Sequence, residues 1–97
     1  SNELPIFKQV KELAEMQIVP GGSHRNASYL QEHILFSANV TRSMQNIMYD
    51  PQTSGGLLLS VPQDSAKGLL KALLPHCPWA RIIGSAAAKG SHEIEVE

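Results

Sequence analysis

The residues best suited to chemistry lie in the segment YDPQTSGGLLLSVP, residues 49–62. Its centre combines hydroxyl side chains with glycines, which let backbone amides approach a bound group closely: Thr53, Ser54, Gly55 and Gly56. Successive amides in such a turn can point into one concavity and bind an anion. The segment therefore admits a phosphate-facing loop, held by an apolar strand that follows it. The same residues also suit a tight turn, and taken alone they favour the turn. The lysine and wider glycine spacing of a Walker motif are missing.

A second segment, PGGSHRN at residues 20–26, has similar chemistry. Its candidate phosphate contacts are two glycines, a hydroxyl and a guanidinium able to grip a phosphate: Gly21, Gly22, Ser23 and Arg25. The alternative is a solvent-exposed turn in which Arg25 pairs with a carboxylate, and turn chemistry predicts a loop here. We interpret His24 as a surface histidine, and Asp50 in the other segment as a turn starter rather than a metal ligand.

No catalytic or metal-binding residue is expected in this chain. Cys77 is the single cysteine, stands between prolines without a histidine or cation beside it, and is interpreted as structural. The remaining histidines have no partners at metal-binding spacing and are interpreted as surface or packing residues: His33, His76 and His92. The carboxylates Glu93, Glu95 and Glu97 are expected on a solvated strand face.

Composition limits the class of protein. A chain of 97 residues, 42% hydrophobic and 18% charged, suits one globular domain. Its net charge of −1 provides no basic field for nucleic acid or a membrane surface. No apolar run is long enough to span a bilayer and no signal peptide is visible, so we expect a cytoplasmic protein. Ser1 and Asn2 resemble a tag remnant, which leaves residues 3–97 as part of a larger protein.

Periodicity predicts helices in the first half of the chain. Apolar residues recur at helical spacing over residues 5–16, with Pro5 suited to the first turn. A short helix over residues 27–33 follows the 20–26 loop. Residues 34–36 suit a strand, and residues 41–49 suit a helical turn that carries Met44, Ile47 and Met48 inward.

The second half predicts a β-α-β-β unit. Residues 57–61 form a continuous apolar run, typical of a strand buried on both faces. Asp64 is expected to cap a helix whose leucines form one apolar stripe. Residues 81–87 predict a second strand with Ile82 and Ile83 inside, and the alternating 92–97 predicts a half-exposed third strand. The fold class is therefore α/β, in its α+β form.

Together, the two glycine segments resemble the selenide, water dikinase family, also called selenophosphate synthetases. That family has a Pro-Gly-Gly-Thr/Ser-x-Arg-Asn loop and then a hydrophobic-Asp-Pro-Gln-Thr-Ser-Gly-Gly-Leu-Leu segment. The matching positions are Pro20, Gly21, Gly22, Ser23, Arg25 and Asn26, followed by residues 50–58. Ser23 stands where threonine is more usual, which keeps the hydroxyl. The ending, from Ala80 to Glu97, is similar to the closing strands of the family.

The resemblance implies the C-terminal part of a domain with the aminoimidazole ribonucleotide synthetase-like fold. It implies a parent transferase that uses ATP and Mg²⁺ to make selenophosphate, the donor for selenocysteine, from selenide and water, releasing AMP and phosphate. The catalytic Cys or selenocysteine, the essential Lys and most Mg²⁺ ligands belong to a preceding N-terminal domain, which also forms the homodimer. This chain is therefore expected to be inactive alone.

Two alternatives stay open from the sequence. The first alternative to a selenide, water dikinase is a non-catalytic binding or assembly module. The second is the C-terminal lobe of another ATP-using enzyme of the same superfamily, such as thiamin-monophosphate kinase or the related hydrogenase maturation protein. A lobe separated from its partner domain should expose an apolar face, so self-association of the chain is expected.

Overall fold

The computed structural model describes residues 3–97, so the proposed tag remnant at residues 1–2 lies outside the described residues. The chain divides into two compact units. The sheet unit comprises Ile6–Gly55 and Lys89–Glu97, and the α4 unit comprises Gly56–Ala88 together with residues 3–5. Helices and short strands give an α+β fold, as the sequence predicted.

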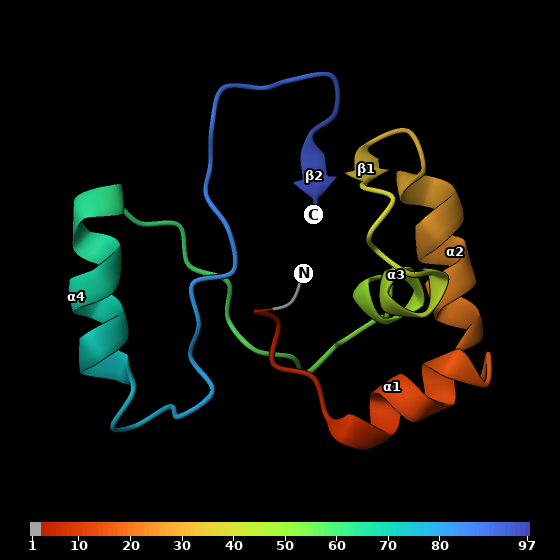
Figure 1. Cartoon of the computed structure of the whole chain (residues 1–97), viewed down its shortest axis with the longest axis horizontal. Helices are drawn as coiled ribbons and strands as arrows, with labels where there is room; N and C mark the ends of the chain where they lie inside the picture. Colours follow the sequence, from red (N-terminus) through yellow and green to blue (C-terminus); the bar gives the residue numbers. More distant parts are fainter. Residues whose placement is uncertain (1–2) are drawn as a thin grey trace. The chain divides into compact units, whose positions relative to one another are not determined.

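The sheet unit packs three helices and one parallel strand pair (Figure 1). Its elements are α1 (Lys8–Glu15), α2 (Gly21–Leu30), β1 (Ile34–Phe36), α3 (Arg42–Met48) and β2 (Ile94–Val96). α3 contacts both α1 and α2. The most buried apolar side chains come from α1, the segments on either side of α3, and β2: Ala14, Val40, Tyr49 and Val96. The small core thus depends on contacts between segments far apart in sequence.

The strand pair joins the middle of the chain to its end. β1 and β2 run parallel, with Ile34 opposite Ile94 and Phe36 opposite Val96. The pair is extended at one end by the amide of Ser37, which donates to the Val96 carbonyl at 2.8 Å. The predicted closing strand is therefore confirmed as β2. Its inward face is only partly covered, since Val96 is 8% exposed and Ile94 is 49% exposed.

α1 is shorter than the predicted helix over residues 5–16, because Phe7 takes an extended backbone conformation as N-cap. Its C-terminus is a Schellman motif. The amide of Ile18 donates to the Leu13 carbonyl at 2.9 Å, and the amide of Gln17 donates to the Ala14 carbonyl at 3.1 Å. This geometry requires a left-handed residue, and Gln17 adopts it with a φ of 60°. Gln17 therefore carries backbone strain that glycine would not.

We expect Gln17→Gly to stabilise the sheet unit by about 0.5–1 kcal/mol, because glycine adopts positive φ without a steric penalty. Urea unfolding followed by circular dichroism measures the change. Glu15→Gly is the matched control: it places glycine inside α1 and should destabilise by a similar amount. Equal losses in both variants would contradict the assigned cap geometry.

The predicted loop at residues 20–26 is wrong, since Gly21 and Gly22 open α2. Pro20 is the N-cap, with φ −61° and ψ 146°, and its carbonyl accepts from the Ser23 amide at 3.0 Å. Two glycines are poor helix formers, but they occupy the first positions rather than the interior. Packing of α2 against α3 supplies the remaining stabilisation. The separate helix predicted over residues 27–33 is the continuation of α2.

α3 confirms the predicted helical turn and begins at a side-chain cap. The Thr41 hydroxyl accepts a hydrogen bond from the Met44 amide at 3.3 Å. The three apolar side chains predicted to face inward are half-buried: Met44, Ile47 and Met48. The strand predicted at residues 34–36 is confirmed as β1.

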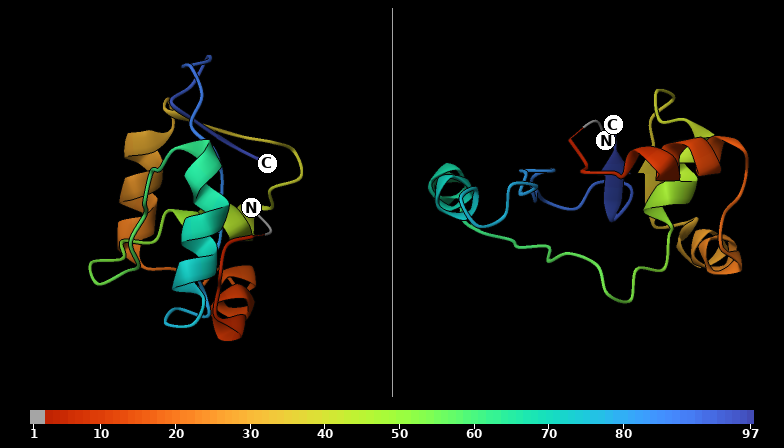
Figure 2. Two further views of the ribbon diagram at one scale, coloured as in Figure 1. Left: turned by 90° about the vertical axis from the view of Figure 1, so that its left-hand side faces the viewer. Right: turned by 90° about the horizontal axis from the view of Figure 1, so that it is seen from below.

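The α4 unit differs from the predicted β-α-β-β arrangement. It contains the helix α4 (Gln63–Leu73), but residues 57–61 and 81–87 form no strand. Leu57 is 91% exposed and Ile82 is 45% exposed, so neither segment is buried as predicted. Figure 2 shows both as extended, irregular trace. A strand requires a hydrogen-bonded neighbour, and the described residues provide none here.

α4 begins one residue before the predicted cap. Pro62 is the N-cap, and its carbonyl accepts from the Ser65 amide at 2.9 Å. Asp64 therefore lies in the first turn of α4 and does not cap the helix. Its carboxylate interacts favourably with the positive end of the helix dipole. Within residues 3–97, no helix has the length and apolar character needed to cross a bilayer.

Candidate anion site at the start of helix α2

The first turn of α2 offers unpaired donors. Pro20 has no side-chain oxygen to cap the helix, and the amides of Gly21 and Gly22 donate to no other described residue. A helix N-terminus carries a partial positive charge that favours anions. Arg25 is exposed and forms no ion pair with the described residues. Its Nη1 would lie 3.8 Å from a Cβ placed on Gly21, so the guanidinium folds back towards the same turn.

Two contacts bring the second glycine segment against this turn. A Cβ atom placed on Gly22 would lie 2.7 Å from Cγ of Pro51, so the proline ring touches the helix backbone where only glycine fits. Four residues along α2, Asn26 Nδ2 donates to the Tyr49 carbonyl at 2.8 Å. Both contacts lie inside the sheet unit. The structure therefore places residues 49–51 against the start of α2.

The loop after Pro51 presents further donors. The Gln52 amide donates to the Asp50 carbonyl at 2.9 Å, and the Thr53 amide donates to the Pro51 carbonyl at 3.1 Å. The next two amides, of Ser54 and Gly55, have no partner among the described residues, and both hydroxyl residues are exposed. Asp50 starts the turn through its backbone carbonyl, as predicted for a turn residue.

Neither Gly55 nor Gly56 has positive φ. One expectation about this loop is wrong. No strand follows to hold the loop, because residues 57–61 are unpaired. Gly56 belongs to the α4 unit, whereas Thr53, Ser54 and Gly55 belong to the sheet unit. Gly56 is therefore not one of the candidate donors within the sheet unit.

Ser23 differs from the other candidates because it is buried. The residue is 2% exposed, and its Oγ has no hydrogen-bond partner within residues 3–97. An unpaired buried hydroxyl costs about 1–3 kcal/mol, so a residue of this kind marks either strain or a ligand contact. In this conformation solvent does not reach the hydroxyl, which therefore contacts a ligand only after local movement.

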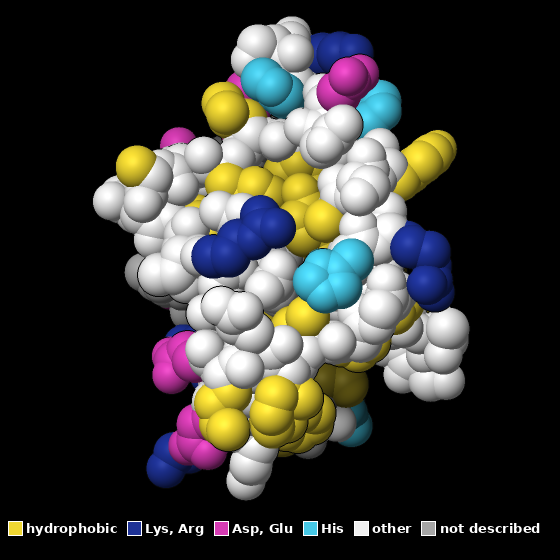
Figure 3. All heavy atoms as spheres, turned by 90° about the vertical axis from the view of Figure 1, so that its right-hand side faces the viewer, with side chains coloured by type: hydrophobic (Ala, Val, Ile, Leu, Met, Phe, Trp, Pro, Cys, Tyr) yellow, Lys and Arg dark blue, Asp and Glu magenta, His cyan; other side chains and the backbone are white. Residues whose placement is uncertain are grey.

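A hollow of about 310 Å³ lies in the sheet unit, and none of the candidate phosphate donors lines it. Its lining comes from α1 and the turn after it, from α2 and from α3: Ala14, Glu15, Gln17, Val19, His24, Arg42, Ser43 and Asn46. Sequence analysis singled out only His24 among these. Figure 3 shows the face of the molecule on the side of α1, α2 and α3, where basic, acidic and histidine side chains are interspersed with apolar ones.

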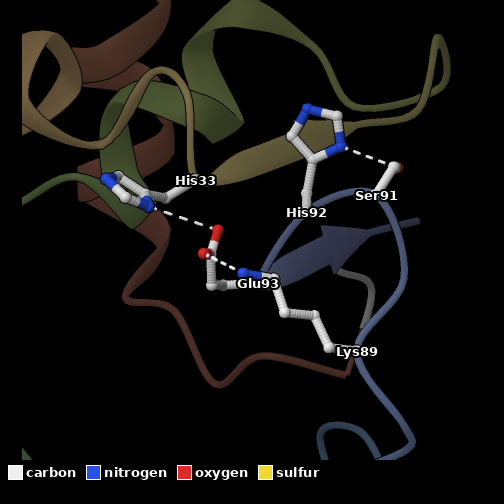
Figure 4. A network of polar contacts seen from close by, with 5 residues as sticks. All are labelled: His33, Lys89, Ser91, His92 and Glu93. Atoms are coloured by element: carbon white, nitrogen blue, oxygen red, sulfur yellow. Dashed lines mark hydrogen bonds and ion pairs between the residues drawn. The ribbon is translucent and has the colours of Figure 1, made fainter.

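A polar network joins the strand pair at its start (Figure 4). Glu93 lies between two partners: its Oε1 is 2.6 Å from Lys89 Nζ and its Oε2 is 3.2 Å from His33 Nδ1. The Lys89 ammonium, the backbone amide of Glu93 and His33 together lower the pKa of the Glu93 carboxyl to about 2. Glu93 is therefore exposed to solvent, as predicted, but it is also paired with Lys89 and His33.

This network predicts a pH dependence of stability. The folded-state pKa of Glu93 is depressed, so its contribution to stability is present above about pH 4.5 and is lost as pH falls towards 2. Thermal unfolding across this range should show a smaller acid-induced loss in Glu93→Gln than in the parent chain. Glu95→Gln, which removes a neighbouring carboxylate of β2, is the control and should follow the parent chain. Parallel curves for all three proteins would contradict the prediction.

The remaining titratable candidates form no second site. Cys77 is a free, exposed cysteine. His92 Nδ1 lies 2.9 Å from Ser91 Oγ and forms a local contact only. Across the described part of the chain, no three histidine, cysteine or acidic side chains are placed to hold a metal ion.

The fold and these contacts define an α+β protein in which a glycine-containing helix start packs against a DPQTSGG loop. The chain is 39% identical over 97 residues to the selenide, water dikinase of Clostridium botulinum (strain Eklund 17B / Type B). It is 40% identical over 97 residues to that of Clostridioides difficile (strain 630). Each match takes in 99–100% of this chain and 28% of the relative. The chain belongs to the selenide, water dikinase family.

A further relative, the selenide, water dikinase of Treponema denticola, is 44% identical over 70 residues, which is 72% of this chain and 20% of the relative. The chain thus spans somewhat over a quarter of the length of the relatives that it matches in full. No family model and no solved structure matches the chain.

Proposed function

We propose that this chain is the C-terminal lobe of a cytoplasmic selenide, water dikinase, which makes selenophosphate from selenide, ATP and water. The catalytic Cys or selenocysteine, the essential Lys and the Mg²⁺ ligands are assigned to the polypeptide that the chain does not span, which also forms the homodimer. The lobe belongs to the aminoimidazole ribonucleotide synthetase-like fold and is inactive alone. Family membership supports this assignment, and the role of the lobe follows from its donors.

The lobe contributes phosphate contacts from one wall of the nucleotide site. The observation that carries this proposal is the contact of Pro51 with Gly22, because two groups of unpaired amides flank it in the sequence. One group is at Gly21 and Gly22, and the other is at Ser54 and Gly55. Arg25 adds a positive charge beside the first group. Such donors suit the oxygens of a phosphate chain.

ATP fits this donor set because its phosphates accept hydrogen bonds and carry negative charge. ATP supplies the phosphoryl group, and the lobe stabilises the charge that develops on its oxygens. Donors fixed before the reaction stabilise that charge more than donors that must reorganise. The described carboxylates are not gathered into a Mg²⁺ site, so we assign the metal to phosphate oxygens and to ligands outside this chain.

Titration of the 97-residue chain with inorganic phosphate, followed by backbone amide NMR, tests the site without catalysis. We expect selective shifts at the four unpaired amides of Gly21, Gly22, Ser54 and Gly55. Sodium chloride at matched ionic strength is the control. Shifts confined to other regions, or equal shifts with chloride, would contradict a preformed phosphate site.

Substitution in a complete enzyme tests the catalytic role. This chain can replace the matching part of the Clostridium botulinum relative. Thr53→Ala and Ser54→Ala should each lower selenide-dependent ATP turnover by at least about tenfold, because a lost donor to developing charge is costly. Ser28→Ala, an exposed serine near the other end of α2, is the control and should leave turnover unchanged. Unchanged turnover in all three variants would overturn a role of the Thr53 and Ser54 hydroxyls as phosphate donors, whereas the phosphate titration tests the amides.

A further inference from the structure

The hollow between α1, α2 and α3 is formed within the sheet unit alone. Its volume of about 310 Å³ lies at the lower end of the range for small-molecule sites, so a ligand of few atoms fits. Half of its lining is buried or half-buried. The other lining side chains are exposed and able to form hydrogen bonds: Glu15, Gln17, His24 and Arg42.

Opposite charges line this hollow without pairing with each other. Glu15 is the last residue of α1 and Arg42 is the first residue of α3, and these two helices pack together. Within residues 3–97, neither Glu15 nor Arg42 forms an ion pair. A carboxylate and a guanidinium that share one hollow, farther apart than an ion pair, leave room for a ligand that carries one charge of each sign.

Arg42 is oriented by contacts on its own side of the hollow. Its Nη1 donates to Gln45 Oε1 at 3.4 Å, and Gln45 Nε2 donates to the Val40 carbonyl at 3.1 Å. Val40 is 5% exposed, so these contacts connect the guanidinium to the core of the unit. The remaining N–H donors of the guanidinium are free to take a carboxylate through two hydrogen bonds.

The residue with a strained backbone lines the same hollow. Gln17 has a φ of 60°, a conformation that glycine adopts without a steric penalty, yet this position carries a long amide side chain. Strained residues of this kind concentrate at ligand sites, where the side chain offsets the strain by its contact. The Gln17 amide can donate to a carboxylate and accept from an ammonium. Backbone strain and unpaired charges therefore occur at one place in the molecule.

We propose that this hollow binds a small zwitterion of the α-amino acid class. Arg42 takes the carboxylate of the ligand, Glu15 takes its ammonium, and Gln17 contacts either group. A simple anion would face the Glu15 carboxylate, and a simple cation would face the Arg42 guanidinium. Only a ligand with both charges meets both walls favourably. The inference depends neither on the phosphate contacts nor on the reaction of the family.

Titration of the 97-residue chain with L-alanine at neutral pH, followed by NMR, tests the proposal. We expect saturable shifts of the side-chain amides of Gln17 and Asn46, which both line the hollow, with a Kd of about 1 mM or below. Propionate lacks the ammonium of L-alanine, and ethylamine lacks its carboxylate. Each should bind at least about tenfold more weakly, because one charged hydrogen bond is lost.

Two substitutions should change the ligand preference in opposite ways. Arg42→Gln should weaken L-alanine and propionate by at least about tenfold and leave ethylamine unchanged. Glu15→Gln should weaken L-alanine and ethylamine by a similar factor and not weaken propionate. Glu12→Gln removes an exposed carboxylate of α1 that does not line the hollow, and this control should bind all three as the parent chain does. A general loss of structure would weaken all three ligands together.

Gln17→Gly separates the backbone strain from the ligand contact. The free energy of unfolding should rise, because glycine relieves the strain at positive φ. The affinity for L-alanine should fall by at least about threefold, because the side-chain amide is lost. Equal affinity in this variant and in the parent chain would overturn the assignment of Gln17 to the ligand.

Three outcomes would overturn the proposal as a whole. Without saturable shifts on addition of L-alanine, the hollow takes no small zwitterion. Propionate or ethylamine binding as tightly as L-alanine would make it a site for a simple anion or a simple cation. An unchanged Kd for L-alanine in both Arg42→Gln and Glu15→Gln would place the bound ligand elsewhere in the chain.

Discussion

Gly22→Ala is expected to destabilise the sheet unit by about 1–3 kcal/mol, because the new methyl group would overlap Pro51. The Cβ position lies 2.7 Å from Cγ of Pro51, closer than carbon atoms approach without displacement. Either α2 or the loop must then move. Urea unfolding of the parent chain and the variant, followed by circular dichroism, measures the change.

Gly21→Ala is the matched control for this substitution. Its Cβ would lie 3.8 Å from Nη1 of Arg25, which is an ordinary contact. Alanine is a better helix former than glycine, so this variant should be as stable as the parent or more stable by up to about 1 kcal/mol. The two changes are chemically identical and adjacent. Equal stability of both variants would contradict the close approach of Pro51 to α2.

The second large effect is expected at Tyr49, which anchors the loop to the core. Its ring packs edge-on against Phe36 of β1, with centroids 5.7 Å apart, and the residue is 7% exposed. Tyr49→Ala removes this packing and should cost about 3–4 kcal/mol. Urea or thermal unfolding measures the loss. In NMR spectra the amides of Ser54 and Gly55 should shift as well, because the loop follows directly after the anchor.

Tyr49→Phe is the control, because it keeps the ring and removes only the hydroxyl. That hydroxyl forms no hydrogen bond with the described residues, so the expected loss is below about 1 kcal/mol. Tyr49→Leu provides an intermediate variant if the alanine change unfolds the unit, and should cost less than alanine. A loss below about 1 kcal/mol in the alanine variant would show that the ring does not hold the loop.

Helices whose apolar residues recur at 3.6-residue spacing were predictable, since that pattern is local. α1 and α4 follow it, and only their ends differed from the prediction. The ends depend on which residue turns to extended backbone, and Phe7 and Pro62 do so without a side-chain cap. Cap residues therefore predicted the helix starts less well than periodicity predicted the helices.

Strands were predicted unevenly, because a strand depends on a neighbour that its own sequence does not specify. The apolar run at residues 57–61 is a stronger local signal than residues 34–36, yet only the latter form a strand. β1 has β2 beside it, held in register from Ile34 to Phe36. Residues 57–61 have no such neighbour in the described chain, so their apolar character produces exposed surface.

By itself, the sequence determined the family and supplied the candidate donors of the site. The two glycine segments, in their order and spacing, were enough to indicate selenide, water dikinase, because such motifs consist of residue types in sequence. Only the tertiary structure decided that Gly21 and Gly22 begin a helix and that Pro51 packs against it. The Asn26–Tyr49 contact spans 23 residues. Contacts over such separations form when helices pack around a shared core, and no local pattern of residues specifies them.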